Sequence, residues 1–385
     1  MKIILIGNYP LDKQESMLRF AIMLSNGFKE KDVQSEIWQP VVVVGSFFSS
    51  FNPTVVKWIG YIDKWILFPI ILKWRLWKNK KLYKEVRFHV CDHSNAPYLK
   101  YLPKNRTAIT CHDVLAIRGA LGHADAYCPP SKFGKILQKW ILKNLLKAKL
   151  LASVSHFTIN QLKNLSNTSS TKDRNWQVIH NAFNAQFFPM KKEQYEPLLR
   201  KMGLDVEVPF LLHIGGGHIR KNRTLLLPMA ALMQKEWEGN IVYAGKPLDS
   251  ATLKLADDLK LTSRVISIVG PNHEELVALY SACEAFVFPS FAEGFGWPVI
   301  EAQACGTVVI ASNHDPMPEV SGNAALHADP KKPIEFADAF VSLKNNFDKR
   351  NTIIDSGFKN IHRFEVSKMI ESYLLLHGYQ AIKHS

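Results

Sequence analysis

The feature that most limits how this chain can fold is a pattern of short apolar strands alternating with helices, which starts twice. Near the N-terminus, a strand at residues 2–6 is followed by a loop at 7–15, a helix at 16–29 and a strand at 35–38. Such alternation is typical of a parallel sheet covered by helices. The same pattern predicts further strands at residues 86–90, 108–110, 150–154 and 176–179.

The pattern begins again after a polar, charged segment at residues 190–205. Strands are expected at residues 210–214, 240–244, 265–269, 285–288 and 308–311, with helices at 222–233, 273–282 and 298–304. We therefore predict an α/β protein of two doubly wound, Rossmann-like domains, at residues 1–189 and 190–365. Residues 366–385 should form a helix that packs back on the first domain. In such folds a ligand binds at the carboxyl ends of the strands, so the predicted site is a cleft between the domains.

Charge is distributed unevenly along the chain, whose net charge is +14. Residues 1–190 contain 27 Lys and Arg against 11 Asp and Glu, a balance of +16, whereas residues 191–385 contain 21 against 23. This asymmetry indicates that the first half meets something anionic, such as a membrane surface or a phosphate-bearing acceptor. Nucleic acid is not expected as a partner, because no recognition motif accompanies the basic residues.

Cysteine usage and the N-terminus bear on the compartment. Five cysteines are few for 385 residues and form no disulfide framework, which favours a reducing compartment. The first apolar run is too short for a signal peptide, and no stretch reaches the roughly 18 apolar residues of a spanning helix. A cytoplasmic protein, in possible peripheral contact with a membrane, is expected.

The most informative segment is residues 289–302, Pro-Ser-Phe-Ala-Glu-Gly-Phe-Gly-Trp-Pro-Val-Ile-Glu-Ala. A buried strand should end before it, and a helix should begin near Pro298, where proline is favoured in the first turn. Glu293 stands before that helix and Glu301 stands about one turn inside it. The glycine-rich loop Gly294-Phe295-Gly296 between them predicts a binding site for an anion or a hydroxyl at the helix start.

This segment resembles the E-x7-E motif of the family-4 retaining glycosyltransferases, which have the GT-B fold. Residues 112–113, 154–155, 180–184 and 212–222 resemble the other landmarks of that family, in the same order. The resemblance implies that Glu293 lies against the transferred sugar, with Gly294, Phe295 and Gly296 beside the donor. It also implies that Glu301 binds the ribose of a nucleotide-diphosphate sugar, which is a donor substrate rather than a cofactor.

A second loop, His-Ile-Gly-Gly-Gly-His-Ile-Arg-Lys-Asn at residues 213–222, should follow the first strand of the second domain. A leaving diphosphate accumulates negative charge, which Arg220, Lys221 and backbone amides can stabilise without a metal. The sequence contains no Asp-x-Asp triplet, which agrees with a metal-independent reaction. The family often has Arg at the position of Gly216, and Arg220 is expected to supply that charge instead.

Three segments of the first half are assigned to the acceptor side. His112 follows a strand and resembles the family histidine that lies against the donor sugar, with Asp113 expected to orient it. Gly7 opens the loop that stands where the family has a glycine-rich loop closing over acceptor and diphosphate. Residues 91–93, Cys-Asp-His, should end a neighbouring strand, and their spacing matches no zinc site that we recognise; no metal is expected.

Two further features suit a membrane surface. Residues 55–77 contain four tryptophans and an apolar run flanked by Lys64 and Lys73, which fits either an interfacial element or an ordinary packed helix. The lysines at positions 132, 135, 139, 143 and 147 form a helical stripe opposite Phe133, Ile136, Leu137, Trp140 and Ile141, which are expected to be core. The lysines suit solvent or anionic headgroups.

The predicted function is therefore a retaining, metal-independent glycosyltransferase that acts on a glycan, a lipid-linked acceptor or a small molecule. Two alternatives remain open at this point. One is another GT-B enzyme, such as a nucleotide-sugar epimerase or a phosphorylase. The other is a noncatalytic binding subunit, which the presence of Glu293, Glu301, Lys221 and His112 disfavours.

Overall fold

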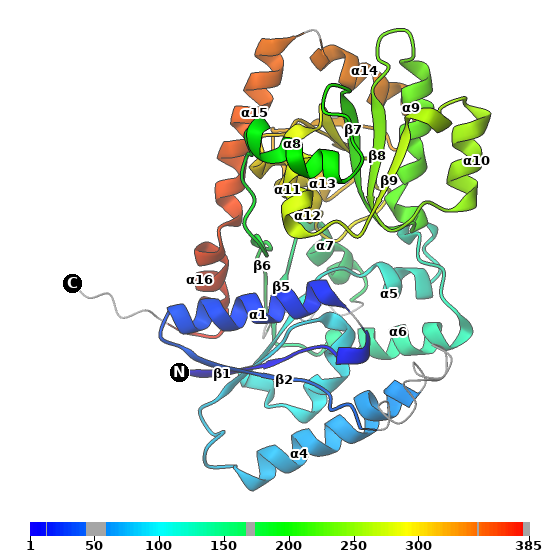
Figure 1. Cartoon of the computed structure of the whole chain (residues 1–385). Helices are drawn as coiled ribbons and strands as arrows, with labels where there is room; N and C mark the ends of the chain where they lie inside the picture. Colours follow the sequence, from blue (N-terminus) through cyan, green and yellow to red (C-terminus); the bar gives the residue numbers. More distant parts are fainter. Residues whose placement is uncertain (13, 44–58, 167–173, 345, 380–385) are drawn as a thin grey trace. The chain divides into compact units, whose positions relative to one another are not determined.

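The computed structural model describes residues 1–12, 14–43, 59–166, 174–344 and 346–379. The chain forms two compact units (Figure 1). Unit 1 comprises Met1–Leu121, Pro130–Asn184 and Val366–Ser385, and unit 2 comprises Gly122–Pro129 and Ala185–Glu365. Residues 122–129, which the sequence pattern assigned to the first domain, thus belong to unit 2. The main division falls after residue 184 rather than after residue 189.

Unit 1 is built on a parallel sheet of six strands in the order β2-β1-β3-β4-β5-β6. The strands are β1 Lys2–Ile6, β2 Gln34–Trp38, β3 Arg87–Val90, β4 Thr107–Cys111, β5 Leu150–Ser153 and β6 Asn175–Val178. Strands β1, β3, β4 and β5 are almost wholly buried, because helices cover both faces of the sheet. All six expected strands of this half are confirmed to within two residues at each end.

Helices lie on the two faces of that sheet (Figure 1). On one face, α1 (Glu15–Glu30) and α16 (Val366–Leu376) pack against Ile3 and Leu5. On the other, η2 (Asp63–Leu67, a π-helix), α4 (Phe68–Lys78), η3 (His93–Tyr101) and α6 (Lys132–Leu145) pack against Ile4 and Ile6. The shorter elements are η1 Pro10–Asp12, η4 Lys104–Arg106, α5 Leu115–Ala120 and α7 His156–Asn164.

Unit 2 repeats the architecture with the strand order β12-β11-β10-β7-β8-β9, again all parallel. The strands are β7 Phe210–Gly215, β8 Asn240–Gly245, β9 Val265–Val269, β10 Ala285–Phe288, β11 Val309–Ser312 and β12 Leu326–Ala328. The first five were expected from the sequence. The three-residue strand β12 was not, because so short a run has no recognisable alternation.

The helices of unit 2 include α9 (Leu226–Leu232) and α14 (Pro333–Lys344), which bury leucine, alanine and phenylalanine side chains against one face of the sheet. The remaining helices are α8 Lys192–Lys201, α10 Ser250–Asp258, α11 His273–Ala282, α12 Trp297–Ala304, α13 Met317–Ser321 and α15 Phe347–Ile361. Single turns are η5 Ala124–Ala126, η6 Ile219–Lys221, η7 Arg223–Leu225, η8 Thr262–Arg264 and η9 His362–Phe364.

The helix expected at residues 222–233 starts later than predicted. Asn222 has a left-handed backbone conformation with φ of 50°, which ends the turn η6, and α9 begins only at Leu226. The side-chain amide of Asn222 donates to the carbonyls of Pro289 (3.1 Å) and Pro330 (2.7 Å). Asparagine tolerates this conformation better than most residues, so a local choice of residue shapes the loop.

The apolar segment expected at residues 55–77 falls partly outside the described residues, and its described part forms η2 and α4. On α6, Ile141 is buried as expected, but the expectation that Phe133 and Ile136 are core is wrong, because both are exposed. None of the helices in the described ranges combines the length and the apolar character that crossing a bilayer requires.

Candidate functional site

The predicted donor residues of unit 2 lie on the loops that follow two neighbouring strands. Strand β7 leads into the loop that carries Arg220 and Lys221, and β10 leads into the loop that carries Glu293. Strands β7 and β10 pair directly. Beyond β7 the sheet continues with β8 and β9, and beyond β10 it continues with β11 and β12. The loops therefore leave the sheet at its topological switch point, where ligands bind in open α/β sheets.

Glu293 is the centre of this site. Its two carboxylate oxygens each lie 2.6 Å from a cation, Oε2 from Nη1 of Arg220 and Oε1 from Nζ of Lys221. All three side chains are largely removed from solvent, Glu293 most of all. Burial alone would raise the pKa of Glu293, but Lys221 and Arg220 outweigh it and lower the pKa below its usual value. The carboxylate is therefore ionised at neutral pH.

Backbone contacts hold the two loops together. The amide of Phe291 donates to the carbonyl of Arg220 at 2.7 Å, and the Arg220 guanidinium donates to the carbonyl of Ala292 at 3.1 Å. The ammonium of Lys221 also lies 4.9 Å from the centroid of the Phe288 ring. Burial lowers the pKa of Lys221, and Glu293 counteracts that effect. The arrangement places two cations against one carboxylate, an excess of positive charge suited to an anion.

The loop after Glu293 has the shape that its glycines allow. Gly294, Phe295 and Gly296 are buried, and Gly296 stands immediately before α12 with φ of 102°. A Cβ atom on Gly296 would lie 2.6 Å from Cε of Met317, so the position is crowded as well as left-handed. Pro298 is the second residue of α12, which confirms the expected helix start.

Glu301 lies in the fifth position of α12 and is also buried. Its Oε2 accepts a hydrogen bond of 2.9 Å from the hydroxyl of Tyr280, which comes from α11. Burial and the neighbouring carboxylate raise the pKa of Tyr280 well above its usual value, so the phenol remains a donor. Sequence reasoning missed Tyr280, because it is separated from Glu301 by 21 residues and stands in an ordinary amphipathic helix.

His213, on β7, begins the segment 213–222 that the sequence singled out, but no role was predicted for it. It is fully buried, and Nδ1 donates to the carbonyl of Val287 on β10 at 3.0 Å. Burial lowers its pKa to about 4, so the ring is neutral at pH 7. A neutral imidazole between the two strands stabilises their pairing beneath the charged loops.

Unit 1 places His112 just after β4, buried against the edge of the Phe20 ring. Its Nε2 donates to the carbonyl of Cys91 at 2.9 Å, which confirms that the ends of β3 and β4 lie side by side. Burial lowers the pKa of His112. Asp113 was expected to orient this ring, but its Oδ1 accepts from the amide of Leu115 at 2.9 Å and begins α5.

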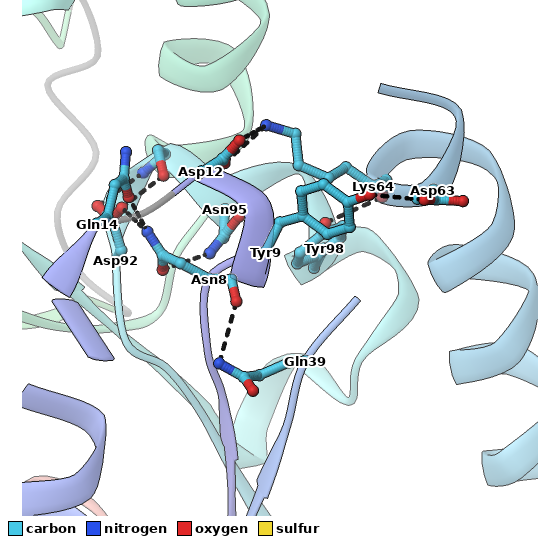
Figure 2. A network of polar contacts seen from close by, with 11 residues as sticks. Asn8, Tyr9, Asp12, Gln14, Gln39, Asp63, Lys64, Asp92, Asn95 and Tyr98 are labelled. Atoms are coloured by element: carbon cyan, nitrogen blue, oxygen red, sulfur yellow. Dashed lines mark hydrogen bonds and ion pairs between the residues drawn. The ribbon is translucent and has the colours of Figure 1, made fainter. Parts of the chain in front are cut away.

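Gly7 follows β1 and opens a loop that a polar network holds in place (Figure 2). The amide of Asn8 donates to Oδ2 of Asp92 at 2.7 Å and to the side chain of Gln14, and the amide of Asn95 donates to Oδ1 of Asn8 at 2.9 Å. Asn8 follows β1 and Asp92 follows β3, which is the switch point of this sheet. The sequence singled out this loop but not the Asn8–Asp92–Asn95 network.

The structure thus brings Glu293, Arg220 and Lys221 into contact in unit 2, whereas the Glu301 carboxylate is hydrogen-bonded to Tyr280. Gly7 and His112 belong to unit 1. Within the described ranges, no group of three or more His, Cys, Asp and Glu side chains is arranged to hold a metal ion.

Comparison with known proteins identifies relatives of this chain. Residues 195–360 match the family described as "Glycosyl transferases group 1". The O-antigen chain mannosyltransferase B of Escherichia coli is 29% identical over 246 residues, which is 60% of this chain and 59% of that protein. The O-antigen chain mannosyltransferase RfbU of Salmonella typhimurium is 28% identical over 81% of this chain and 79% of its own length.

Solved structures share the fold. Sucrose-phosphate synthase from Thermosynechococcus elongatus matches with a TM-score of 0.73 at 19% identity and covers 98% of both chains. Anabaena HepE, in complex with UDP and glucose, matches with a TM-score of 0.69 at 14% identity over 99% of this chain and all of that one. The two doubly wound units of this chain therefore form the GT-B fold.

Proposed function

Because residues 195–360 match the family of group 1 glycosyltransferases, we propose that the chain transfers a hexosyl residue from a nucleoside diphosphate sugar to a hydroxyl group of an acceptor. The observation that carries this proposal is the buried cluster of Arg220, Lys221 and Glu293 at the switch point of unit 2. A diphosphate leaving group needs cations and a sugar needs an oriented carboxylate, and this cluster offers both.

The cations stabilise the leaving group. As the bond between the anomeric carbon and the diphosphate oxygen breaks, negative charge grows on the diphosphate, and Lys221 and Arg220 neutralise it there. Preorganised charges of this kind act strongly in a site from which water is excluded. We propose that they suffice without a metal ion, since two cations face one carboxylate and leave an excess of positive charge for the diphosphate.

Glu293 positions the sugar. Its lowered pKa keeps it anionic, so it accepts hydrogen bonds from sugar hydroxyls rather than donating a proton. The acceptor oxygen attacks the anomeric carbon on the face from which the diphosphate departs, and a diphosphate oxygen takes the acceptor's proton. The configuration at the anomeric carbon is therefore retained, without a covalent intermediate on Glu293.

Glu301 binds the ribose. Two vicinal hydroxyls suit a carboxylate, and Tyr280 fixes the orientation of the Glu301 carboxylate by occupying one of its oxygens. Gly294, Phe295 and Gly296 form the loop beside the donor. His112 and Gly7, from unit 1, are assigned to the sugar and to the acceptor side.

The sugar that the comparisons favour is mannose, since both O-antigen relatives are mannosyltransferases by name. The acceptor is then a growing glycan or a lipid-linked sugar. The match spans 59% of the first relative's own length, so the choice of mannose is part of the proposal.

The test is a transfer assay with GDP-mannose and UDP-glucose, with and without a mannosylated acceptor. We expect transfer from GDP-mannose that persists in excess EDTA, and an α-mannoside in the NMR spectrum of the fresh product. A β-anomer would exclude retention, and activity abolished by EDTA and restored by a divalent ion would exclude the metal-free mechanism. Sugar altered without acceptor would indicate an epimerase instead.

A further inference from the structure

One side of the continuous helix at residues 59–78 in unit 1, which includes η2 and α4, exposes large apolar side chains. The exposed fractions of this apolar row are 40% for Ile62, 54% for Ile66, 59% for Ile70, 53% for Trp74 and 77% for Trp77. Successive members are three or four residues apart, which aligns them along one side of a helix. Phe68 and Leu72, on the opposite side, are fully buried in the core of unit 1.

The apolar surface extends onto α6. The ring of Phe133 lies 5.6 Å from that of Tyr61, and the ring of Trp140 lies 5.0 Å from that of Trp65. Ile136 stands between Phe133 and Trp140 on the same side of α6 and is 68% exposed. Two helices far apart in sequence therefore meet through aromatic rings, and each exposes large apolar side chains, which together form the apolar surface.

Cations border this surface. Residues 64–84 contain seven Lys and Arg and no Asp or Glu, and residues 132–147 contain five lysines and no acid. The cations around α4 include exposed Lys73, Lys78 and Lys80, and Nζ of Lys78 lies 4.8 Å from the centroid of the Trp74 ring. Tryptophan prefers the headgroup level of a bilayer, and lysines beside it attract anionic lipid.

The same helix is joined to the loop after β1. The hydroxyl of Tyr9 donates to Oδ2 of Asp63 at 2.6 Å, and Nζ of Lys64 lies 2.8 and 3.1 Å from the two carboxylate oxygens of Asp12 (Figure 2). Asp63 and Lys64 are both buried, and the hydroxyl of Tyr98 donates to the Lys64 carbonyl at 2.9 Å. Buried polar contacts of this kind fix one geometry.

We propose that the apolar row on η2 and α4, with its border of cations, docks on the surface of a bilayer that contains anionic lipids. The π-helix in this row holds Tyr9 and Asp12 through Asp63 and Lys64, so docking fixes the acceptor loop at the membrane surface. The second part rests on the proposed function, because it takes that loop as part of the acceptor site. The acceptor is accordingly a sugar on a membrane-anchored carrier.

Flotation with vesicles of phosphatidylcholine, with and without phosphatidylglycerol, tests the docking. We expect the wild type to bind the anionic vesicles, and the triple variant Ile70→Gln, Trp74→Gln, Trp77→Gln to lose at least about tenfold in partitioning. The matched control is Leu253→Gln with Phe347→Gln in unit 2, where the side chains are 50% and 77% exposed. Equal partitioning of the triple variant and the wild type would overturn the proposal.

The charges have a separate signature. Lys73→Gln with Lys78→Gln and Lys80→Gln should weaken binding at 0.1 M salt and have little further effect at 1 M, because the Debye length falls from about 10 Å to about 3 Å. Quenching of Trp74 and Trp77 by brominated lipid, absent in the Trp74→Phe, Trp77→Phe variant, should place them in the bilayer. A dimer in solution that the triple variant abolishes, without vesicle binding, would overturn docking in favour of a second copy.

The coupling to the loop is tested by Tyr9→Phe, which removes only the hydroxyl that binds Asp63. This variant should float with anionic vesicles like the wild type, yet show a higher KM for a vesicle-borne acceptor and an unchanged KM for the donor. An unchanged acceptor KM would overturn the coupling. Affinity for a nucleoside diphosphate, measured on the triple variant, separates the docking proposal from the proposed function. That affinity depends on unit 2, so it should be unchanged in this variant and should be absent only if the proposed donor site is wrong.

Discussion

The two units place a buried polar cluster at equivalent points, where the strand order of each sheet reverses, but the clusters differ in chemistry. In unit 2, Glu293 meets Arg220 and Lys221 at 2.6 Å each. In unit 1, Asn8 and Asn95 are joined by amide hydrogen bonds, and Asp92 accepts from Asn8 at 2.7 Å. One cluster is ionic with an excess of cations, whereas the other is mostly a network of amides.

This difference indicates that the same fold position serves two purposes. Buried charges are costly unless they are compensated, so two cations against one carboxylate leave a site that a further anion would complete. A satisfied amide network has little left to offer a ligand, but it holds its loop in one conformation. Unit 2 is therefore expected to bind charge, and unit 1 to position a loop.

The largest effect should come from the ionic cluster. Lys221→Ala removes one of the two charges that we propose stabilise the leaving diphosphate, and turnover should fall by about 10²–10³-fold. Steady-state kinetics with saturating donor measure it. Lys254→Ala, an exposed lysine on α10, is the matched control and should leave turnover unchanged. A loss of less than about threefold at Lys221 would show that the cluster does not carry the leaving-group charge.

The amide network should instead show its importance in stability. Asp92→Asn leaves His93, whose Nδ1 lies 3.1 Å from the carboxylate, without its anion, and the unfolding free energy of unit 1 should fall by about 2–4 kcal/mol. Urea denaturation measures the change, with Asp355→Asn on the exposed side of α15 as control. If Asp92→Asn were as stable as the wild type but had lost transfer activity, Asp92 would not act by holding the loop after β1 in position.

The pH dependence of that loss sharpens the comparison. Burial would raise the pKa of Asp92, but His93 outweighs burial and lowers that pKa. The Asp92 carboxylate therefore stabilises the folded state above about pH 4, and this stabilisation is lost in acid. Burial would lower the pKa of His93, but Asp92 raises it, so its contribution is present below about pH 6.5 and is lost as the pH rises through the raised pKa. The cost of Asp92→Asn should therefore be larger at about pH 5 than at about pH 9.

A smaller effect is expected at the ribose side of unit 2. Glu301→Gln keeps the shape but removes the charge, and donor dissociation constants should rise by about tenfold or more, as for loss of a hydrogen bond to a charged group. Turnover should change less, because a ribose contact contributes to ground and transition states alike. Titration calorimetry with the donor measures it, and Glu274→Gln on the exposed side of α11 is the control. Unchanged affinity would remove Glu301 from the donor site.

The smallest effect should be that of Tyr280→Phe, which leaves Glu301 in place but removes its 2.9 Å hydrogen bond. A neutral donor contributes about 1 kcal/mol, so donor affinity should fall about fivefold. The same titration serves, with Tyr195→Phe on α8 as control. An effect larger than that of Glu301→Gln would mean that the tyrosine contacts the donor itself.

Most of the fold was predictable from the sequence, because the strands of a parallel sheet are buried on both faces and therefore appear as apolar runs. Eleven of the twelve strands in the described part of the chain were expected, and β12 (Leu326–Ala328) was too short to be recognised. The late start of α9 was not expected, since it depends on the left-handed conformation of Asn222. The side-chain amide of Asn222 donates to the carbonyls of Pro289 and Pro330, which lie far away in the sequence.

The sequence by itself determined which residues of unit 2 we assign to a donor site, since Glu293, Gly294, Gly296 and Glu301 lie within nine residues and Arg220 adjoins Lys221. Only the tertiary structure decided which groups meet. Arg220 and Glu293 are 73 residues apart, and Asn8 and Asp92 are 84 apart. Such contacts depend on strand order and on the packing of helices over the sheet, which local spacing does not encode. The exposure of Ile66, Ile70 and Trp77 was likewise undecided, because the same apolar helix is core or surface according to which side the sheet covers.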